Sequence, residues 1–231
     1  MRNLVLLPGF MLNEHLWDDM RDDLATLGSL TFGDIGQDIG IQAMADAVLR
    51  QAPERFVLLG FSMGGFVAQA VALKAPERVQ ALALLNTSSR AQTERESLGT
   101  RAQIELAQRT PFKGLTSRAL ASSVHPSLST DRVLLDRLQA MALANGKEVF
   151  LRQLQTLRDS NSEDLQQLRC PVLIVASDQD RLRSVEESEE MAQRIAQARL
   201  EIIRDCGHMT PMEKPRELFT LIADWIAQSG H

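Results

Sequence analysis

A five-residue turn, Gly60-Phe61-Ser62-Met63-Gly64, limits the folds open to this chain more than any other segment does. It follows the apolar run at residues 56–59 and precedes the mostly small and apolar residues 65–70, so a strand, a tight turn and a helix are expected. Glycine at both ends of the turn leaves room for a strained backbone at Ser62. The pattern is that of a nucleophile elbow, which exposes the hydroxyl at the end of a buried strand. The simpler interpretation makes Ser62 an ordinary turn residue before a core helix.

Short runs rich in Val and Leu recur along the chain, each followed by an amphipathic stretch. Predicted strands cover residues 4–7, 30–32, 56–59, 81–85, 172–176 and 200–203. Predicted helices cover about 14–27, 41–51, 63–75, 185–196 and 215–227. Most of the strands are continuously apolar, which is typical of strands covered on both faces. The alternation predicts an α/β fold, with a mostly parallel sheet of about six strands flanked by helices.

The alternation of strands and helices stops between Thr87 and Leu168, where only amphipathic helices are predicted. Leu134, Leu138 and Met141 share one helical face, as do Phe150, Leu154 and Leu157. We therefore predict a core of residues 1–87 and 169–231 and a helical cap insertion of residues 88–168 over the carboxyl ends of the strands. The alternative is that these helices simply extend the core.

A serine nucleophile needs a base, and the base needs an acid that orients it. Among the four histidines, His15, His125, His208 and His231, only His208 follows a predicted strand. The carboxyl ends of parallel strands share one edge of a sheet, so His208 is expected beside Ser62. Gly207 is expected to let the backbone bend sharply there.

Two aspartates, Asp178 and Asp180, follow the predicted strand 172–176, and either could serve as the acid. A tetrahedral intermediate would also need backbone N–H donors around its oxygen. The candidates are the amide of Met63, directly after the nucleophile, and the amide of Phe10, which follows Gly9 in the loop after the first strand.

Composition narrows the possible partners and location. Net charge is −5, from 25 Lys and Arg against 30 Asp and Glu, and no basic block is present, so nucleic acid is an unexpected partner. No apolar run approaches the roughly 20 residues that span a bilayer, and the apolar start is too short for a signal peptide. A soluble, cytoplasmic protein without metal or cofactor is expected, either monomer or homodimer. Cys170 and Cys206 are expected to be reduced and mostly buried.

Together these segments resemble the α/β-hydrolase-fold superfamily, and in particular its capped serine esterases, enol-lactonases and carbon–carbon hydrolases. The matching segments are residues 7–10 with Trp17 downstream, 60–65, 75–79, 171–175, 177–180, and 207–209 followed by 213–215. The resemblance implies Ser62 as nucleophile and His208 as base, with the Phe10 and Met63 amides as oxyanion hole. It favours Asp180 as the acid, because the family's acid stands three residues after a strand-end glycine.

The chain departs from the family pattern at several places. Relatives often carry His-Gly where this chain has Pro8-Gly9, and their Gly-rich connection after the second strand is shortened here to residues 33–36. The two antiparallel strands that usually come first are also missing from the predicted sheet. Phe66 stands where relatives that make a menaquinone precursor usually have Arg, which argues against that subfamily. A serine nucleophile also excludes the family's dehalogenase and epoxide-hydrolase chemistries, which use Asp.

The expected activity is hydrolysis of small carboxylic esters through an acyl-enzyme on Ser62. The pocket walls are expected to come from Phe10, Met63, Met209 and the insertion.

Two alternatives differ from this expectation. An enol-lactonase, or a carbon–carbon bond hydrolase of a dicarbonyl acid, would want a cation facing the site, and the insertion offers Arg109, Lys113 and Arg118. A catalytically silent ligand-binding protein on the same fold would usually have lost one of the three catalytic side chains.

Overall fold

The computed structural model describes residues 2–229 and contains one six-stranded sheet. Every pair of neighbouring strands is parallel, and the strand order is β2-β1-β3-β4-β5-β6. The strands are β1 (Arg2–Leu7), β2 (Gly28–Phe32), β3 (Phe56–Phe61), β4 (Val79–Leu85), β5 (Val172–Ser177) and β6 (Ala198–Ile203). The predicted parallel sheet of about six strands is confirmed.

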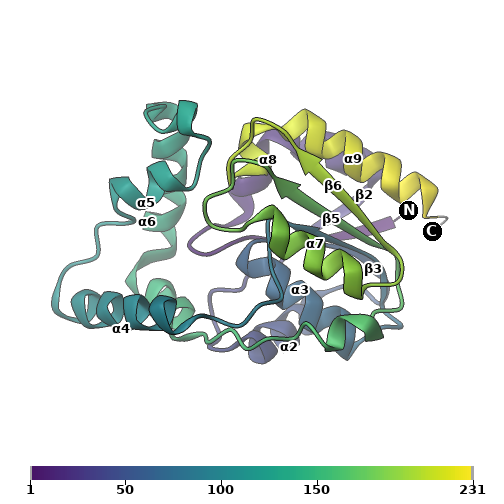
Figure 1. The fold of residues 1–231 in the computed structure, drawn as a ribbon, viewed down its shortest axis with the longest axis horizontal. Helices are drawn as coiled ribbons and strands as arrows, with labels where there is room; N and C mark the ends of the chain where they lie inside the picture. Colours follow the sequence, from purple (N-terminus) through teal and green to yellow (C-terminus); the bar gives the residue numbers. More distant parts are fainter. Residues whose placement is uncertain (1, 230–231) are drawn as a thin grey trace.

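Helices cover both faces of the sheet (Figure 1). One face packs against η1 (Glu14–Met20), α1 (Arg21–Leu27) and α9 (Pro215–Gln228), and the other against α2 (Ile41–Gln51), α3 (Met63–Lys74) and α7 (Val185–Arg194). Alternate residues of a strand point to opposite faces. In β1, for example, Leu4 and Leu6 enter the first cluster, whereas Val5 and Leu7 enter the second. Burial on both faces explains why the strands are apolar throughout.

The segment between β4 and β5 is helical and lies beside one end of the sheet (Figure 1). It contains α4 (Glu94–Arg109), α5 (Ser117–Ser122), η2 (Pro126–Leu128), α6 (Arg132–Gln155) and η3 (Asp164–Gln167). The predicted apolar face at Leu134, Leu138 and Met141 is buried and joins the sheet's hydrophobic cluster. Helix α4, in contrast, has no buried residue.

Three local predictions differ from the structure. The helix predicted over residues 14–27 is a 3-10 helix up to Met20 and an α-helix only afterwards. Strand β2 begins at Gly28 rather than at residue 30, because Gly28 already pairs with Arg2 of β1 and strand pairing outweighs low strand propensity. Leu157 is wrongly placed on the face of Phe150 and Leu154, since α6 ends at Gln155 and Leu157 is exposed.

Candidate active site

Ser62 occupies a strained turn between β3 and α3. Its backbone angles are φ 51° and ψ −114°, in the left-handed half of the map that costs a non-glycine residue roughly 1–3 kcal/mol. The surrounding chain holds this conformation. The Ser62 amide donates to the carbonyl of Leu85 (2.9 Å), and the hydroxyl of Thr87 donates to the Ser62 carbonyl (2.7 Å).

Glycines flank the turn because the neighbouring backbone leaves no space for a side chain. A Cβ at position 60 would lie 2.5 Å from the Gly64 carbonyl oxygen, and one at position 64 would lie 2.3 Å from the Pro8 carbonyl oxygen. A Cβ at Gly65 would lie 2.4 Å from Oγ1 of Thr87. The turn therefore packs directly against the loop that follows β1, which brings the candidate oxyanion loop to the elbow.

The structure brings Ser62, His208 and Asp180 together in one hydrogen-bonded series. Nε2 of His208 lies 2.9 Å from Oγ of Ser62, and Nδ1 lies 2.7 Å from Oδ2 of Asp180. An ionised carboxylate only accepts hydrogen bonds, so Nδ1 carries the proton and Nε2 is the acceptor for the serine hydroxyl. The His208 and Asp180 side chains are 2% and 1% exposed, so water competes little for these contacts.

The Asp180 carboxylate accepts further hydrogen bonds besides that of His208. Oδ1 accepts the amides of Leu182 (2.8 Å) and Arg183 (3.0 Å), and Oδ2 also accepts Nδ2 of Asn86 (3.1 Å). Burial by itself raises the pKa of Asp180, but the charge and hydrogen bond of His208, with the other donors, lower it below its usual value. The carboxylate therefore stays ionised at neutral pH and fixes the imidazole tautomer.

Asn86 is a site residue that sequence reasoning missed. Its Nδ2 donates to Asp180 and to Oγ of Ser177 (2.9 Å), and its Oδ1 accepts the hydroxyl of Thr210 (2.7 Å). The Ser177 hydroxyl lies 2.7 Å from that of Thr210, which completes a buried network behind the carboxylate. No local sequence pattern marks Asn86 or Thr210, because the network joins residues from three different strand ends.

Glu213, on the short helix α8 (Thr210–Glu213), holds the loop that carries His208. Its carboxylate accepts the amides of Gly207 and Met209, on either side of the histidine, each at 2.9 Å. Gly207 plays a different part from the one expected, since its φ is not in the left-handed region. A Cβ there would lie 2.2 Å from the His125 amide nitrogen, so the glycine permits close packing against the helical insertion.

The backbone amides of Phe10 and Met63 are the two candidate donors to an oxyanion. Among residues 2–229, neither N–H donates to another protein group. Met63 opens helix α3, where the aligned peptide dipoles favour negative charge. Gly64 packs on the Pro8 carbonyl, which keeps the loop containing Phe10 beside the elbow. Two such N–H groups can stabilise an anionic oxygen that develops near Ser62.

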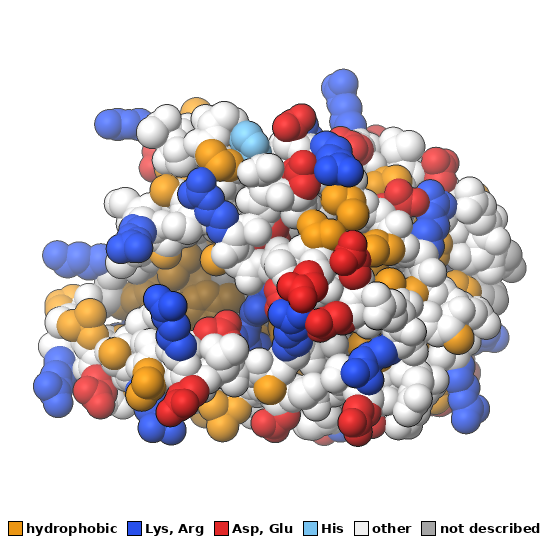
Figure 2. Space-filling model, in the orientation of Figure 1, with side chains coloured by type: hydrophobic (Ala, Val, Ile, Leu, Met, Phe, Trp, Pro, Cys, Tyr) orange, Lys and Arg blue, Asp and Glu red, His pale blue; other side chains and the backbone are white. Residues whose placement is uncertain are grey.

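A cavity of about 210 Å³ opens onto Ser62 and His208. Its walls come from the edge of the sheet, from the loop of residues 8–13 (the Phe10 loop) and from the helical segment between β4 and β5. The lining residues are Phe10, Leu12, Phe61, Ser62, Gln103, Leu115, Ala119, Leu120, Ser122, Ser123, Leu138, Leu182, His208 and Met209. Phe10 and Met209 line it as expected, whereas Met63 is not among the lining side chains. Figure 2 shows hydrophobic side chains at the bottom of a hollow between α4 and α5.

The remaining candidates lie elsewhere or play other parts. Asp178 faces Arg204 at 3.9 Å and does not contact His208. His15 pairs with Asp18 on the surface. His125 belongs to the insertion and contacts Ser127, whereas His231 lies outside the described residues.

Both cysteines are buried and free, as predicted. Burial raises the pKa of the Cys170 thiol to about 11, and burial together with the charge of Glu213 raises that of Cys206 to about 11. Only a thiolate reacts fast, so we expect the native protein to resist 5,5′-dithiobis(2-nitrobenzoate) at pH 8. Both thiols should react within minutes after unfolding in guanidinium. Rapid labelling of the native protein would show that one thiol is accessible and ionised.

Two further findings concern residues 2–229. No helix there is both long and apolar enough to cross a lipid bilayer. Within the same residues, no three His, Cys, Asp or Glu side chains gather in a way that could hold a metal ion.

The fold and the elbow together define the class of this protein. A parallel sheet carries a strained serine between a strand and a helix, and residues 37–215 match the profile of the family described as alpha/beta hydrolase fold. The chain belongs to that family.

Among curated proteins, the chain is 43% identical over 94 residues to the pimeloyl-[acyl-carrier protein] methyl ester esterase of Citrobacter koseri, and 44% identical over 94 residues to that of Klebsiella pneumoniae. Each match spans 37% of this chain and 37% of the relative. Among solved structures, a thermophilic esterase from Thermogutta terrifontis is 26% identical with a TM-score of 0.89, covering 99% of this chain and 90% of that one. The enol-lactonase from Burkholderia xenovorans LB400 is 18% identical with a TM-score of 0.85, covering 98% of this chain and 91% of that one, and shows likeness of fold alone.

Proposed function

We propose that this protein hydrolyses small, uncharged carboxylic esters through an acyl-enzyme on Ser62. The observation that carries the proposal is the series Ser62–His208–Asp180 beside an apolar cavity. The esterases among its relatives support the same bond type. The ligand is a small-molecule ester, and the location in the cytoplasm remains a prediction from the sequence.

In the first half of the reaction, Oγ of Ser62 attacks the acyl carbonyl while Nε2 of His208 takes the hydroxyl proton. The amides of Phe10 and Met63 stabilise the oxyanion of the tetrahedral intermediate. The bond from the acyl carbon to the alcohol oxygen then breaks, and His208 returns the proton to the departing alcohol. Asp180 stabilises the imidazolium through Nδ1 and keeps the ring oriented.

In the second half, His208 takes a proton from water, and the resulting hydroxide oxygen bonds to the acyl carbon. The ester bond to Ser62 breaks when His208 gives that proton to Oγ. The carboxylic acid leaves, and the enzyme returns to its starting state without a metal or cofactor.

We propose that residues 88–168 form a cap on a core made of residues 1–87 and 169–231. Each of the three main helices of this segment contributes to the cavity, with Gln103 from α4, Leu120 from α5 and Leu138 from α6. Such a cap would shield the acyl-enzyme from bulk water and select the acyl group.

The lining of the cavity favours an uncharged acyl group. Among the described residues, no Lys, Arg, Asp or Glu lines it, and its polar side chains are Gln103, Ser122, Ser123, Ser62 and His208. The cations named for the lactonase and dicarbonyl alternative, Arg109, Lys113 and Arg118, are absent from this lining. A carboxylate bound here would lose its hydration without gaining a partner charge, which costs several kcal/mol.

Two activated esters of similar length test this proposal. We expect kcat/KM for p-nitrophenyl hexanoate to exceed that for the p-nitrophenyl monoester of glutaric acid by about 100-fold or more, since the second ends in an unpaired carboxylate. The release of p-nitrophenol measures both rates, and spontaneous hydrolysis of each ester provides the background. Rates within threefold of each other would contradict the uncharged-substrate proposal.

A further inference from the structure

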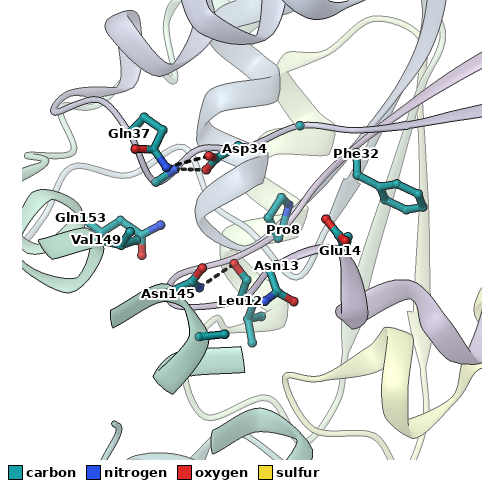
Figure 3. Close-up of a pocket in the computed structure, with 13 residues that line it drawn as sticks. Pro8, Leu12, Asn13, Glu14, Phe32, Asp34, Gln37, Asn145, Val149 and Gln153 are labelled. Carbon is teal, nitrogen blue, oxygen red and sulfur yellow. Dashed lines mark hydrogen bonds between the residues drawn. The ribbon is translucent and has the colours of Figure 1, made fainter. Parts of the chain in front are cut away.

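A second cavity lies between the Phe10 loop and helix α6 (Figure 3). It encloses about 280 Å³ and shares Leu12 with the first cavity, but Ser62 does not line it. Gln153 and Asn145, both on α6, line it and extend toward the loop (Figure 3). These two α6 side chains, which line the cavity, are the ones that hydrogen-bond to the loop.

Two side chains of α6 hold two consecutive residues of the loop. Oε1 of Gln153 accepts the amide of Met11 at 2.8 Å, and Nδ2 of Asn145 donates to the carbonyl of Leu12 at 3.1 Å. The oxygen assignment of Gln153 follows from chemistry, because an amide N–H needs an acceptor. Gln153 is 4% exposed and lies 142 residues from Met11 in sequence.

The loop needs such a contact because its backbone is strained. Met11 has φ 57°, an uncommon value for a residue with a long side chain, and its side chain is fully buried against Ala142, Phe150 and Leu154. Conformations of this kind persist only where the surroundings hold them. Helix α6 is kinked at Gly146, where φ is 76° and ψ is −179°, and it contacts the loop from both sides of the kink, through Asn145 and Gln153.

The contact with Met11 also constrains the neighbouring amide of Phe10. The two N–H groups belong to successive peptide planes, and only two backbone torsions at Phe10 relate the orientation of one plane to the next. Fixing the Met11 N–H therefore restricts the direction of the Phe10 N–H. An oxyanion donor must point at its target before the charge develops, since reorientation during the reaction would add to the barrier.

We infer that Gln153 is a positioning residue for the oxyanion hole, and that Asn145 supports the same loop. The inference rests on the proposed function of Ser62. It gives α6 a second role, because the helix that lines the cavity beside Ser62 through Leu138 would also orient the Phe10 amide. Loss of Gln153 should weaken binding of the transition state while leaving ground-state binding unchanged.

The test compares Gln153→Met, which keeps the length but removes the acceptor, with Gln155→Met, an exposed position on the same helix. We expect Q153M to lower kcat for p-nitrophenyl butyrate by about 10- to 100-fold, with KM within threefold of wild type, because one oxyanion donor is worth about 100- to 1000-fold when fully removed. Asn145→Leu should have an effect of the same sign but smaller. Q155M should match wild type.

A second measurement separates positioning from a loss of structure. Propyl trifluoromethyl ketone adds to an active serine as an oxyanion adduct, so its inhibition constant should rise in Q153M by the same factor as kcat/KM falls. Melting temperatures report on folding. If the methionine variant is unstable, Gln153→Asn replaces it, since this shorter amide cannot reach the Met11 N–H. A kcat within threefold of wild type in both variants, or a fall in kcat without weaker inhibition, would overturn the inference. Failure of the proposed function looks different, since wild type would then be inactive or Ser62→Ala would be active.

Discussion

Replacing Ser62 with alanine is expected to lower kcat/KM for p-nitrophenyl butyrate by about 10⁴-fold or more. In the proposed mechanism the hydroxyl oxygen bonds to the acyl carbon, so the variant could only assist direct attack by water. Alanine removes a single oxygen and suits the partly exposed turn, so the variant should fold. A fluorophosphonate probe should label wild type and leave the Ser62→Ala protein unlabelled.

The matched control is Ser127→Ala, which removes an exposed hydroxyl of the helical segment between β4 and β5 that lies 2.8 Å from Nδ1 of His125. It should keep full activity and full labelling. Wild-type rates in the Ser62→Ala protein would remove the basis for an acyl-enzyme. An inactive, unlabelled wild type would instead favour a silent binding protein on this fold.

Replacing Asp180 with asparagine is expected to lower kcat by roughly 10³- to 10⁴-fold. An asparagine Nδ2 placed at the position of Oδ2 would face Nδ1 of His208 as a donor, which favours the tautomer with the proton on Nε2. In that tautomer the imidazole cannot accept the proton of Ser62. Asn86 would lose its acceptor at position 180 but would keep its hydrogen bonds to Ser177 and Thr210, so the loss should appear in kcat more than in folding.

Asp178→Asn is the matched control for this prediction, because Asp178 is the other acid that the sequence offers. It approaches Arg204 and makes no contact with His208, so activity within threefold of wild type is expected. Steady-state kinetics with p-nitrophenyl butyrate measures both variants. Should Asp178→Asn prove the more damaging of the two, the assignment of the acid would have to be reversed.

The order of strands and helices could be predicted because each strand is buried on both faces. Continuous apolar runs such as residues 56–59 and 172–176 have no other favourable environment in a chain of this size. Strand and helix ends were less predictable. Gly28 starts β2 only because β1 lies beside it. Residues 14–20 form a 3-10 helix, which the hydrophobic periodicity of the sequence does not distinguish from an α-helix.

Candidate site residues could be found where the chemistry needs a particular local pattern. Ser62 required a turn with glycine at positions 60 and 64, and His208 required a loop after a strand, both of which are visible in sequence. The supporting side chains carry no such pattern. Asn86, Glu213 and Gln153 act through contacts with residues far away in the chain, so no window of sequence contains both partners.

The sequence by itself determined the alternation of elements, the elbow and the order of serine, aspartate and histidine, because these depend on local burial and local backbone geometry. The residues left Asp178 and Asp180 open and only the family resemblance favoured Asp180, whereas the tertiary structure places the Asp180 carboxylate beside Nδ1 of His208. It also decided which insertion side chains enter the cavity and that Gln153 holds the Phe10 loop. The physical reason is that hydrogen bonds and packing act over a few ångströms in space. The number of residues between two positions in the sequence does not tell how far apart they lie in the fold.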